Sequence, residues 1–61
     1  MLVVYIISFT DNKGHLGVVK FPAVSPLMAQ AWAELCFEAN QWLIVTLRAD
    51  ENVIWSASNA N

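Results

Sequence analysis

Apolar residues dominate the beginning of the chain. The run LVVYIISF (2–9) is rich in β-branched and aromatic residues and carries no charge. It predicts a β-strand, because eight such residues are too few to bury usefully as a helix. Both alternating sets of the run are apolar: Val4 and Ile6 form one, and Val3, Tyr5, Ile7 and Phe9 form the other. A strand of this kind is expected at the centre of a sheet with both faces covered at least in part. The pattern leaves open which set meets which neighbour, because a shift of one residue exchanges them.

A polar turn follows this strand. Asp11-Asn12-Lys13-Gly14 has the chemistry of a type I turn closed by a glycine in the left-handed region, which predicts a hairpin. The second strand is expected from His15 to about Phe21, with Pro22 ending it. Lys20 and Pro22 are typical of an edge strand, because both discourage further pairing.

Ser25 and Pro26 mark the start of a helix, since serine is a preferred N-cap and proline is favoured at the first helical position. Asn40 is expected to end the helix in the left-handed conformation. At about 100° per residue, one apolar stripe of this helix is predicted to face the core. It comprises Met28, Trp32, Leu35 and Ala39, with Ala31 and Cys36 at its sides and Gln30, Glu34 and Gln41 opposite.

Phe37 departs from that pattern because it lies close to the polar side of the predicted helix. Two interpretations remain open. A loop or a long neighbouring side chain covers it in part, or it is a contact residue for a partner.

Two further strands are predicted in the last third of the chain. Residues 42–49 (WLIVTLRA) carry a clean apolar set, and their second set is mixed. The apolar set is Leu43, Val45 and Leu47, and the mixed set is Trp42, Ile44, Thr46 and Arg48. Asp50-Glu51-Asn52 is expected to form a three-residue hairpin loop with Asn52 at positive φ, leading to a short strand over 53–57. The tail SNAN is expected to fray.

These elements predict a single α+β domain over residues 1–61, ordered β-β-α-β-β. The most apolar strand belongs in the middle, which gives an antiparallel sheet of order 2-1-3-4 with one helix on one face. No element is left to cover the other face of the sheet. That face is expected to meet a second copy of the chain or another protein.

The composition also favours association. In a chain of 61 residues, burial at ~25 cal/mol/Å² contributes on the order of 90 kcal/mol, and ordering the chain opposes it by about the same amount. One cysteine excludes an internal disulfide, and one cysteine with one histidine makes no usual zinc set. No cofactor is therefore expected. The hydrophobic fraction of 57% then suggests that a partner surface, most simply in a homodimer, supplies the missing stability.

Little in the sequence indicates catalysis. His15 follows a turn glycine, Cys36 lies beside the predicted core stripe, and Glu34 and Glu38 are one helical turn apart on the solvent side. Their ordinary interpretations are an exposed histidine, a buried inert thiol and a solvated face. We therefore expect no enzymatic activity. The opening run is too short to span a membrane, and no basic residue precedes it as in a secretory signal, so a cytoplasmic location is expected.

Nucleic-acid binding is a weaker alternative. Tyr5, Phe9 and Trp42 could share an open sheet face and stack bases, as in RNA-recognition modules. Such surfaces also carry basic residues, and only Arg48 is placed to help. The net charge of −2 disfavours phosphate backbones as well.

The middle of the chain resembles a known class of small proteins. The stretch HLGVVKFPAVSPLMAQAWAELCFEANQWLIVTLRA (15–49) combines an edge strand, a Pro-Ala-x-Ser helix entry, an alanine-rich helix and a strand ending in arginine. It is similar to very small phage-encoded proteins that bind and inhibit bacterial host machinery, including short inhibitors of host RNA polymerase. Those inhibitors use several basic residues near the last core strand, and only Arg48 has a counterpart here. The resemblance thus implies a small protein-binding inhibitor, and the equally compact anti-CRISPR proteins fit the same description.

Taken together, these patterns predict a non-enzymatic protein-binding module, phage-like, that occludes a surface of a larger bacterial protein. The alternative is a structural homo-oligomer that uses the open sheet face for self-association. The predicted partner-binding residues are Tyr5, Phe9, Phe37, Trp42 and Arg48, with Asp50 and Glu51 as a polar rim.

Overall fold

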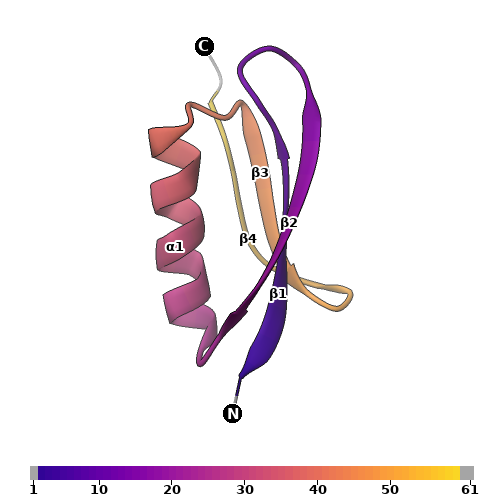
Figure 1. Cartoon of the computed structure of the whole chain (residues 1–61), viewed down its shortest axis with the longest axis vertical. Helices are drawn as coiled ribbons and strands as arrows, with labels where there is room; N and C mark the ends of the chain where they lie inside the picture. Colours follow the sequence, from indigo (N-terminus) through magenta and orange to yellow (C-terminus); the bar gives the residue numbers. More distant parts are fainter. Residues whose placement is uncertain (1, 60–61) are drawn as a thin grey trace.

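The chain forms one antiparallel sheet with a helix lying across one of its faces (Figure 1). The computed structural model describes residues 2–59. Its elements are β1 (Val3–Thr10), β2 (Leu16–Ala23), α1 (Pro26–Ala39), β3 (Ile44–Ala49) and β4 (Asn52–Ser58). The strand order is β2-β1-β3-β4, with every neighbouring pair antiparallel. The predicted α+β class, strand order and single covering helix are confirmed.

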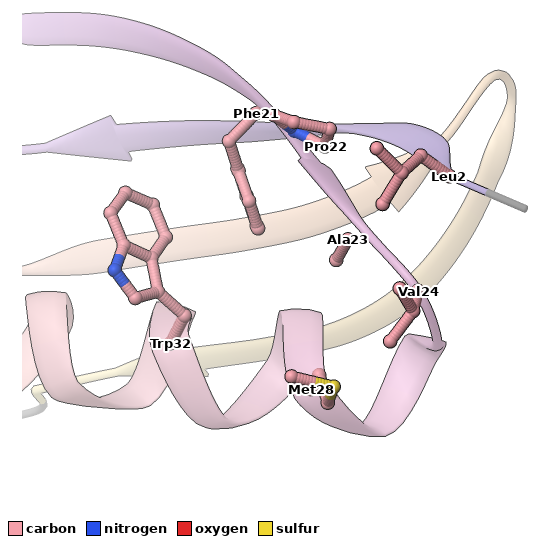
Figure 2. A pocket seen from close by; sticks show the side chains of 7 residues that line it. All are labelled: Leu2, Phe21, Pro22, Ala23, Val24, Met28 and Trp32. Carbon is pink, nitrogen blue, oxygen red and sulfur yellow. The ribbon is translucent and has the colours of Figure 1, made fainter.

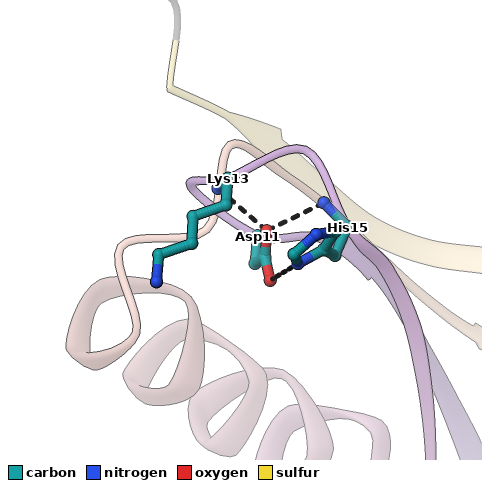
Figure 3. Close-up of polar contacts among 3 residues, drawn as sticks. All are labelled: Asp11, Lys13 and His15. Carbon is teal, nitrogen blue, oxygen red and sulfur yellow. Dashed lines mark hydrogen bonds and ion pairs between the residues drawn. The ribbon is translucent and has the colours of Figure 1, made fainter.

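The turn between β1 and β2 has the predicted chemistry. The Asp11 carboxylate accepts hydrogen bonds from the backbone N–H groups of Lys13 at 2.8 Å and His15 at 2.9 Å (Figure 3). Gly14 has a φ of 86°, in the left-handed region that a glycine adopts without strain. The two backbone hydrogen bonds stabilise the ionised carboxylate, so the pKa of Asp11 lies below its ordinary value, with a smaller contribution from His15. His15 Nδ1 lies 3.4 Å from Asp11 Oδ2.

β2 extends beyond the predicted boundary, because Pro22 lies within the strand opposite Val4 of β1. The prediction that Pro22 ends the strand is wrong. The Asp11 N–H donates to the His15 carbonyl at 2.8 Å, so residues 11 and 15 form a hydrogen-bonded pair of the antiparallel ladder. Such pairs alternate, so the backbone groups of Pro22 point away from β1. Proline is tolerated there because no N–H is needed at an outward edge position.

The orientation of β1 is now settled. Tyr5 and Ile7 are buried beneath the helix, and Phe9 packs against the same core. Val4 points to the other face and is exposed, with Ile6 and Ser8 half-buried beside it. The set that contains Tyr5 therefore faces the helix. We call this the covered face of the sheet and the other one the open face.

The helix begins as predicted and packs through a different side. Ser25 caps it, with the Ser25 Oγ accepting from the Met28 N–H at 3.2 Å, and Pro26 is its first residue. The buried helical residues are Ala29 and Ala33, and Cys36 and Phe37 pack next to them. The predicted core stripe is wrong: Met28, Trp32 and Leu35 are exposed, as is Ala39. Two alanines allow the helix backbone to lie close to the sheet, which leaves the large side chains on its flank.

The helix end also differs from the prediction. Asn40 keeps a right-handed backbone with a φ of −96°, and its side-chain amide donates to the Cys36 carbonyl at 2.9 Å. Gln41, with a φ of 53°, takes the left-handed conformation instead. This reversal precedes β3 and directs Trp42 into the core, where its exposed fraction is 8%.

The last hairpin is one residue tighter than predicted. Ala49 pairs with Asn52, so the loop is Asp50-Glu51, and Asp50 rather than Asn52 has positive φ, at 53°. A register shift between Leu47 and Arg48 places Trp55 opposite Leu47 and Val53 opposite Arg48. β4 includes Ser58, and the Asn59 N–H donates to the Leu43 carbonyl at 2.7 Å. The predicted fraying therefore fails for Ser58 and Asn59, and Ala60 and Asn61 lie outside the described residues.

Candidate interaction surfaces

All seven aromatic side chains lie on the covered side of the sheet, where each contacts another aromatic ring. Phe9 and Trp42 stack with ring centres 3.9 Å apart and planes 7° from parallel. Phe9 also lies over Gly17, so that a Cβ at position 17 would overlap its ring. Phe21 connects Tyr5, at 6.0 Å, to Trp32, at 4.5 Å. The aromatic residues thus serve packing beneath the helix.

This arrangement corrects the positions expected for three predicted partner-binding residues and decides between the two interpretations of Phe37. Tyr5 is only 3% exposed and Trp42 is buried, so neither lies on the open face. Phe9 is half-buried against Trp42. Phe37 is half-buried and packs edge-on against Trp55 at 6.3 Å, so a neighbouring side chain covers it. Tyr5 and Phe9 lie beneath the helix because of the register of β1, and Trp42 lies there because of the backbone reversal at Gln41.

The other three predicted residues are at the surface but are not brought together in one polar rim. Arg48 projects from β3 onto the open face and is half-buried there. Asp50 and Glu51 are exposed at the tip of the β3–β4 hairpin. Sequence reasoning therefore located one residue of the open face correctly and missed the rest of that surface.

The open face is built from cross-strand rows. Its middle rows carry hydroxyl groups, from Ser8 next to Val18 and Thr46, and from Thr10 next to Leu16 and Ile44. Leu16, Val18 and Ile44 are exposed, and these residues line a shallow hollow of about 240 Å³. Small hydroxyl side chains flanked by exposed aliphatic ones give a surface able to form both hydrogen bonds and apolar contacts.

The next row carries two positive charges. Ile6 of β1 pairs with Lys20 of β2 on one side and with Arg48 of β3 on the other. Lys20 and Arg48 are therefore two strands apart, about 10 Å between Cα atoms. No carboxylate shares this face within the described strands, and the ion pair found among residues 2–59 is between Asp11 and His15. The open face thus holds two of the three basic residues of the chain without an anionic partner.

A second surface lies between the helix flank and the end of β2. A cleft of about 450 Å³ opens there, and Figure 2 shows Phe21 and Trp32 together at one end of it, where their ring centres are 4.5 Å apart. All of its lining residues are apolar. They come from β2, from the helix, from the residue before β1 and from the residue after β2. They are Leu2, Phe21, Pro22, Ala23, Val24, Met28 and Trp32. We call this surface the β2 groove.

The β2 groove contains two residues, Met28 and Trp32, of the helical stripe that the sequence periodicity assigned to the core. Met28 is 59% exposed and Trp32 is 42% exposed, whereas Ala29 and Ala33 are buried. The periodicity was real, because these large residues do share one side of the helix. The missing signal was the run of small residues on the neighbouring side, which permits closer packing on a sheet.

The remaining reactive groups show no convergence. Desolvation raises the pKa of the half-buried Cys36 thiol, which favours its protonated and less nucleophilic form. Within residues 2–59, no group of three or more His, Cys, Asp or Glu side chains is placed to hold a metal ion. The helix described in this part of the chain lacks the length and apolar character needed to cross a membrane.

No protein-family model, curated protein sequence or solved structure matches this chain.

Proposed function

We propose that this protein is a non-enzymatic protein-binding module whose open sheet face docks onto an apolar surface bearing acidic groups on a larger protein. The observation that carries the proposal is the row Lys20–Ile6–Arg48. Its aliphatic residue has one cation on each side, and neither cation forms an ion pair within residues 2–59. Arginine is a frequent anchor of protein interfaces, and its planar group pairs well with carboxylates. Exposed Leu16, Val18 and Ile44 supply apolar area next to this row.

The resemblance to phage-encoded inhibitors supports a particular kind of partner. A module of this size that covers part of a bacterial protein would inhibit by occlusion and would need no catalytic group. Such a module would act in the bacterial cytoplasm.

Charge reversal tests the proposal. Arg48→Glu and Lys20→Glu each change the net charge from −2 to −4, since one basic residue is replaced by an acidic one. Lys13→Glu makes the same change in the exposed β1–β2 turn, away from the open face, and serves as the matched control. A partner captured from bacterial lysate would be identified, purified and titrated with all three variants by calorimetry. We expect Arg48→Glu to weaken binding by about 2–5 kcal/mol and Lys13→Glu to leave it nearly unchanged. Equal effects of the two substitutions would refute docking through the open face.

Self-association through the open face is the second candidate, because five aliphatic residues are exposed there. They are Val4, Leu16, Val18, Ile44 and Val53. A two-fold interface presents the same patch from both copies, so it would hold Lys20 and Arg48 of each copy, with no carboxylate from the described residues of this face. Burying four cations in this way opposes such a dimer. Sedimentation equilibrium distinguishes the candidates: a dimer that Ile44→Thr and Val18→Thr dissociate would establish self-association.

The open face gives less support to nucleic-acid binding. No aromatic side chain projects from it, so base stacking has no platform there.

A further inference from the structure

The β2 groove and the free edge of β2 lie next to each other, and together they form a site that neither makes alone. Alternation from the hydrogen-bonded pair of Asp11 and His15 directs the N–H groups of Leu16, Val18 and Lys20 away from β1. Within residues 2–59, β2 has no strand on its other side in the sheet. These backbone groups are therefore available to a fifth strand.

The side chains of β2 divide between the two faces in the same register. Leu16, Val18 and Lys20 point to the open face and are exposed. Gly17, Val19 and Phe21 point to the covered side, where Phe21 borders the β2 groove together with Trp32 and Met28. An added strand would alternate in the same way. Every second side chain would lie on the covered side, where the one next to Phe21 would enter the groove, and the others would lie on the open face.

The charge of Lys20 determines which residue an added strand would place opposite it on the open face. Lys20 lies on the edge strand without a carboxylate near it, and directly opposed residues on neighbouring strands interact strongly. A purely apolar strand would desolvate Lys20 without compensation. A strand with an aspartate or glutamate opposite Lys20 would pair with it. Of the two residues on either side of that carboxylate, one would then lie beside Phe21, at the apolar groove, and the other beside Val19, which packs against the core and does not line the groove.

The geometry points to a peptide-binding site: the edge of β2 accepts an extended segment of a partner protein with the pattern apolar–acidic–apolar. The backbone bonds to Leu16, Val18 and Lys20 supply affinity, and the β2 groove and Lys20 supply specificity. This site differs from the open-face row of the proposed function and does not depend on it. Lys20 belongs to both, whereas Met28 belongs to the β2 groove and Arg48 to the open-face row.

A synthetic peptide tests the inference. The probe is a fluorescein-labelled, capped nonapeptide with threonine at odd positions, valine or leucine at even positions and glutamate at the central position. We expect saturable binding that falls about tenfold in Met28→Lys and little in Leu27→Lys. Leu27 is the matched control, because it is the neighbouring residue, is 77% exposed and does not line the groove. Absence of saturable binding up to about 1 mM would overturn the proposal, as would equal effects of the two substitutions.

The charge pair is tested by exchange. Lys20→Glu should weaken binding of the glutamate peptide about threefold and strengthen binding of a peptide with central lysine, whereas Lys13→Glu should do neither. Arg48→Glu should leave the peptide affinity nearly unchanged even if it abolishes docking of an open-face partner. A peptide affinity that follows Arg48 instead of Met28 would assign the binding to the open face and overturn the inference.

Hydrogen exchange gives a readout specific to strand addition. In the free protein, the amides of Leu16, Val18 and Lys20 should exchange rapidly and those of Val19 and Phe21 slowly. The peptide should slow the first three and change the other two little. Sedimentation of the protein without peptide tests the other possible occupant of the groove, a second copy of the chain. A dimer that Met28→Lys dissociates and Leu27→Lys does not would place a second copy in the groove and overturn the peptide assignment.

Discussion

The two faces of the same sheet are built by opposite means. On the covered face, Ile7, Val45 and Leu47 are fully buried, and every aromatic ring packs against another. On the open face, the same strands present hydroxyl groups, exposed aliphatic residues and two cations. The difference places the buried apolar contacts on one side of the molecule and leaves aliphatic and charged side chains exposed on the other. A domain of this size is expected to have a stability of only roughly 3–9 kcal/mol, so the covered face has little to spare.

The largest expected effect compares one substitution on the two faces. Leu47→Ala removes a fully buried side chain and should destabilise the fold by about 3 kcal/mol, because it loses apolar burial and leaves a cavity. Leu16→Ala makes the same change at a residue that is 84% exposed, and should change stability by less than about 0.5 kcal/mol. Urea denaturation followed by tryptophan fluorescence measures both. Comparable losses would mean that the open face is not free in solution.

Gly17 sharpens the comparison at a single position of β2. An alanine there would overlap the Phe9 ring, displace it from its stack on Trp42 and destabilise the fold by about 2 kcal/mol. Ser8→Ala, on the open face of the neighbouring strand, should lie within about 0.5 kcal/mol. The double variant Gly17→Ala with Phe9→Val is the control, since a smaller residue at position 9 leaves room for the new methyl group. If the two losses simply add in this cycle, the overlap with Phe9 is not their cause.

Leu35 tests which side of the helix belongs to the core. It is 65% exposed, so Leu35→Gln should change the free energy of unfolding by less than about 0.5 kcal/mol. The matched substitution Cys36→Ser, one position along on the covered side, should be clearly more destabilising because it places a hydroxyl group in an apolar contact. A large loss at Leu35 would restore the stripe predicted from periodicity and contradict the observed helix orientation.

The smallest expected effect concerns the hairpin that joins β1 and β2. The pKa of Asp11 is lowered in the folded state by the hydrogen bonds from His15 and Lys13. Its contribution to stability is therefore complete above the unfolded pKa, near 4, and is lost as the pH falls through the lower folded value. We expect Asp11→Asn to melt slightly below the wild type at pH 6, and the two melting temperatures to converge as the pH falls through the lowered pKa of Asp11. A gap that widens on acidification would have the wrong sign for this linkage.

The sequence determined the fold more fully than the surfaces. Strand order and helix start followed from strong local signals, the continuous apolar run in 2–9 and the Ser25-Pro26 pair. The sides of the helix and of β1 that meet the core did not follow from the sequence. Both alternating sets of β1 are apolar, and the helix has small apolar residues next to its stripe of large ones, so periodicity cannot choose between them. The choice depends on tertiary packing: Ala29 and Ala33 allow close approach to the sheet, and the bulky Trp32 does not.

The expected positions of three predicted partner-binding residues were wrong for a related reason. Tyr5, Phe9 and Trp42 were assigned to an open surface because aromatic residues are common anchors of interfaces. In a chain with such a small interior, the same rings are needed to fill the core. Arg48 was placed correctly because a charged residue in the middle of β3 has no stable position beneath the helix.

The separation of charge between the two sides affects how a partner would approach. Lys20 and Arg48 project from the open face, whereas Glu34 and Glu38 lie on the helix. The molecule therefore has an electric dipole moment that the net charge of −2 conceals. An acidic partner is weakly repelled at long range and attracted once the open face turns towards it within a Debye length, about 8 Å in physiological salt. The long-range repulsion and the short-range attraction oppose one another, so the association rate should depend only weakly on ionic strength. Encounters in which the open face does not turn towards the partner should not lead to binding.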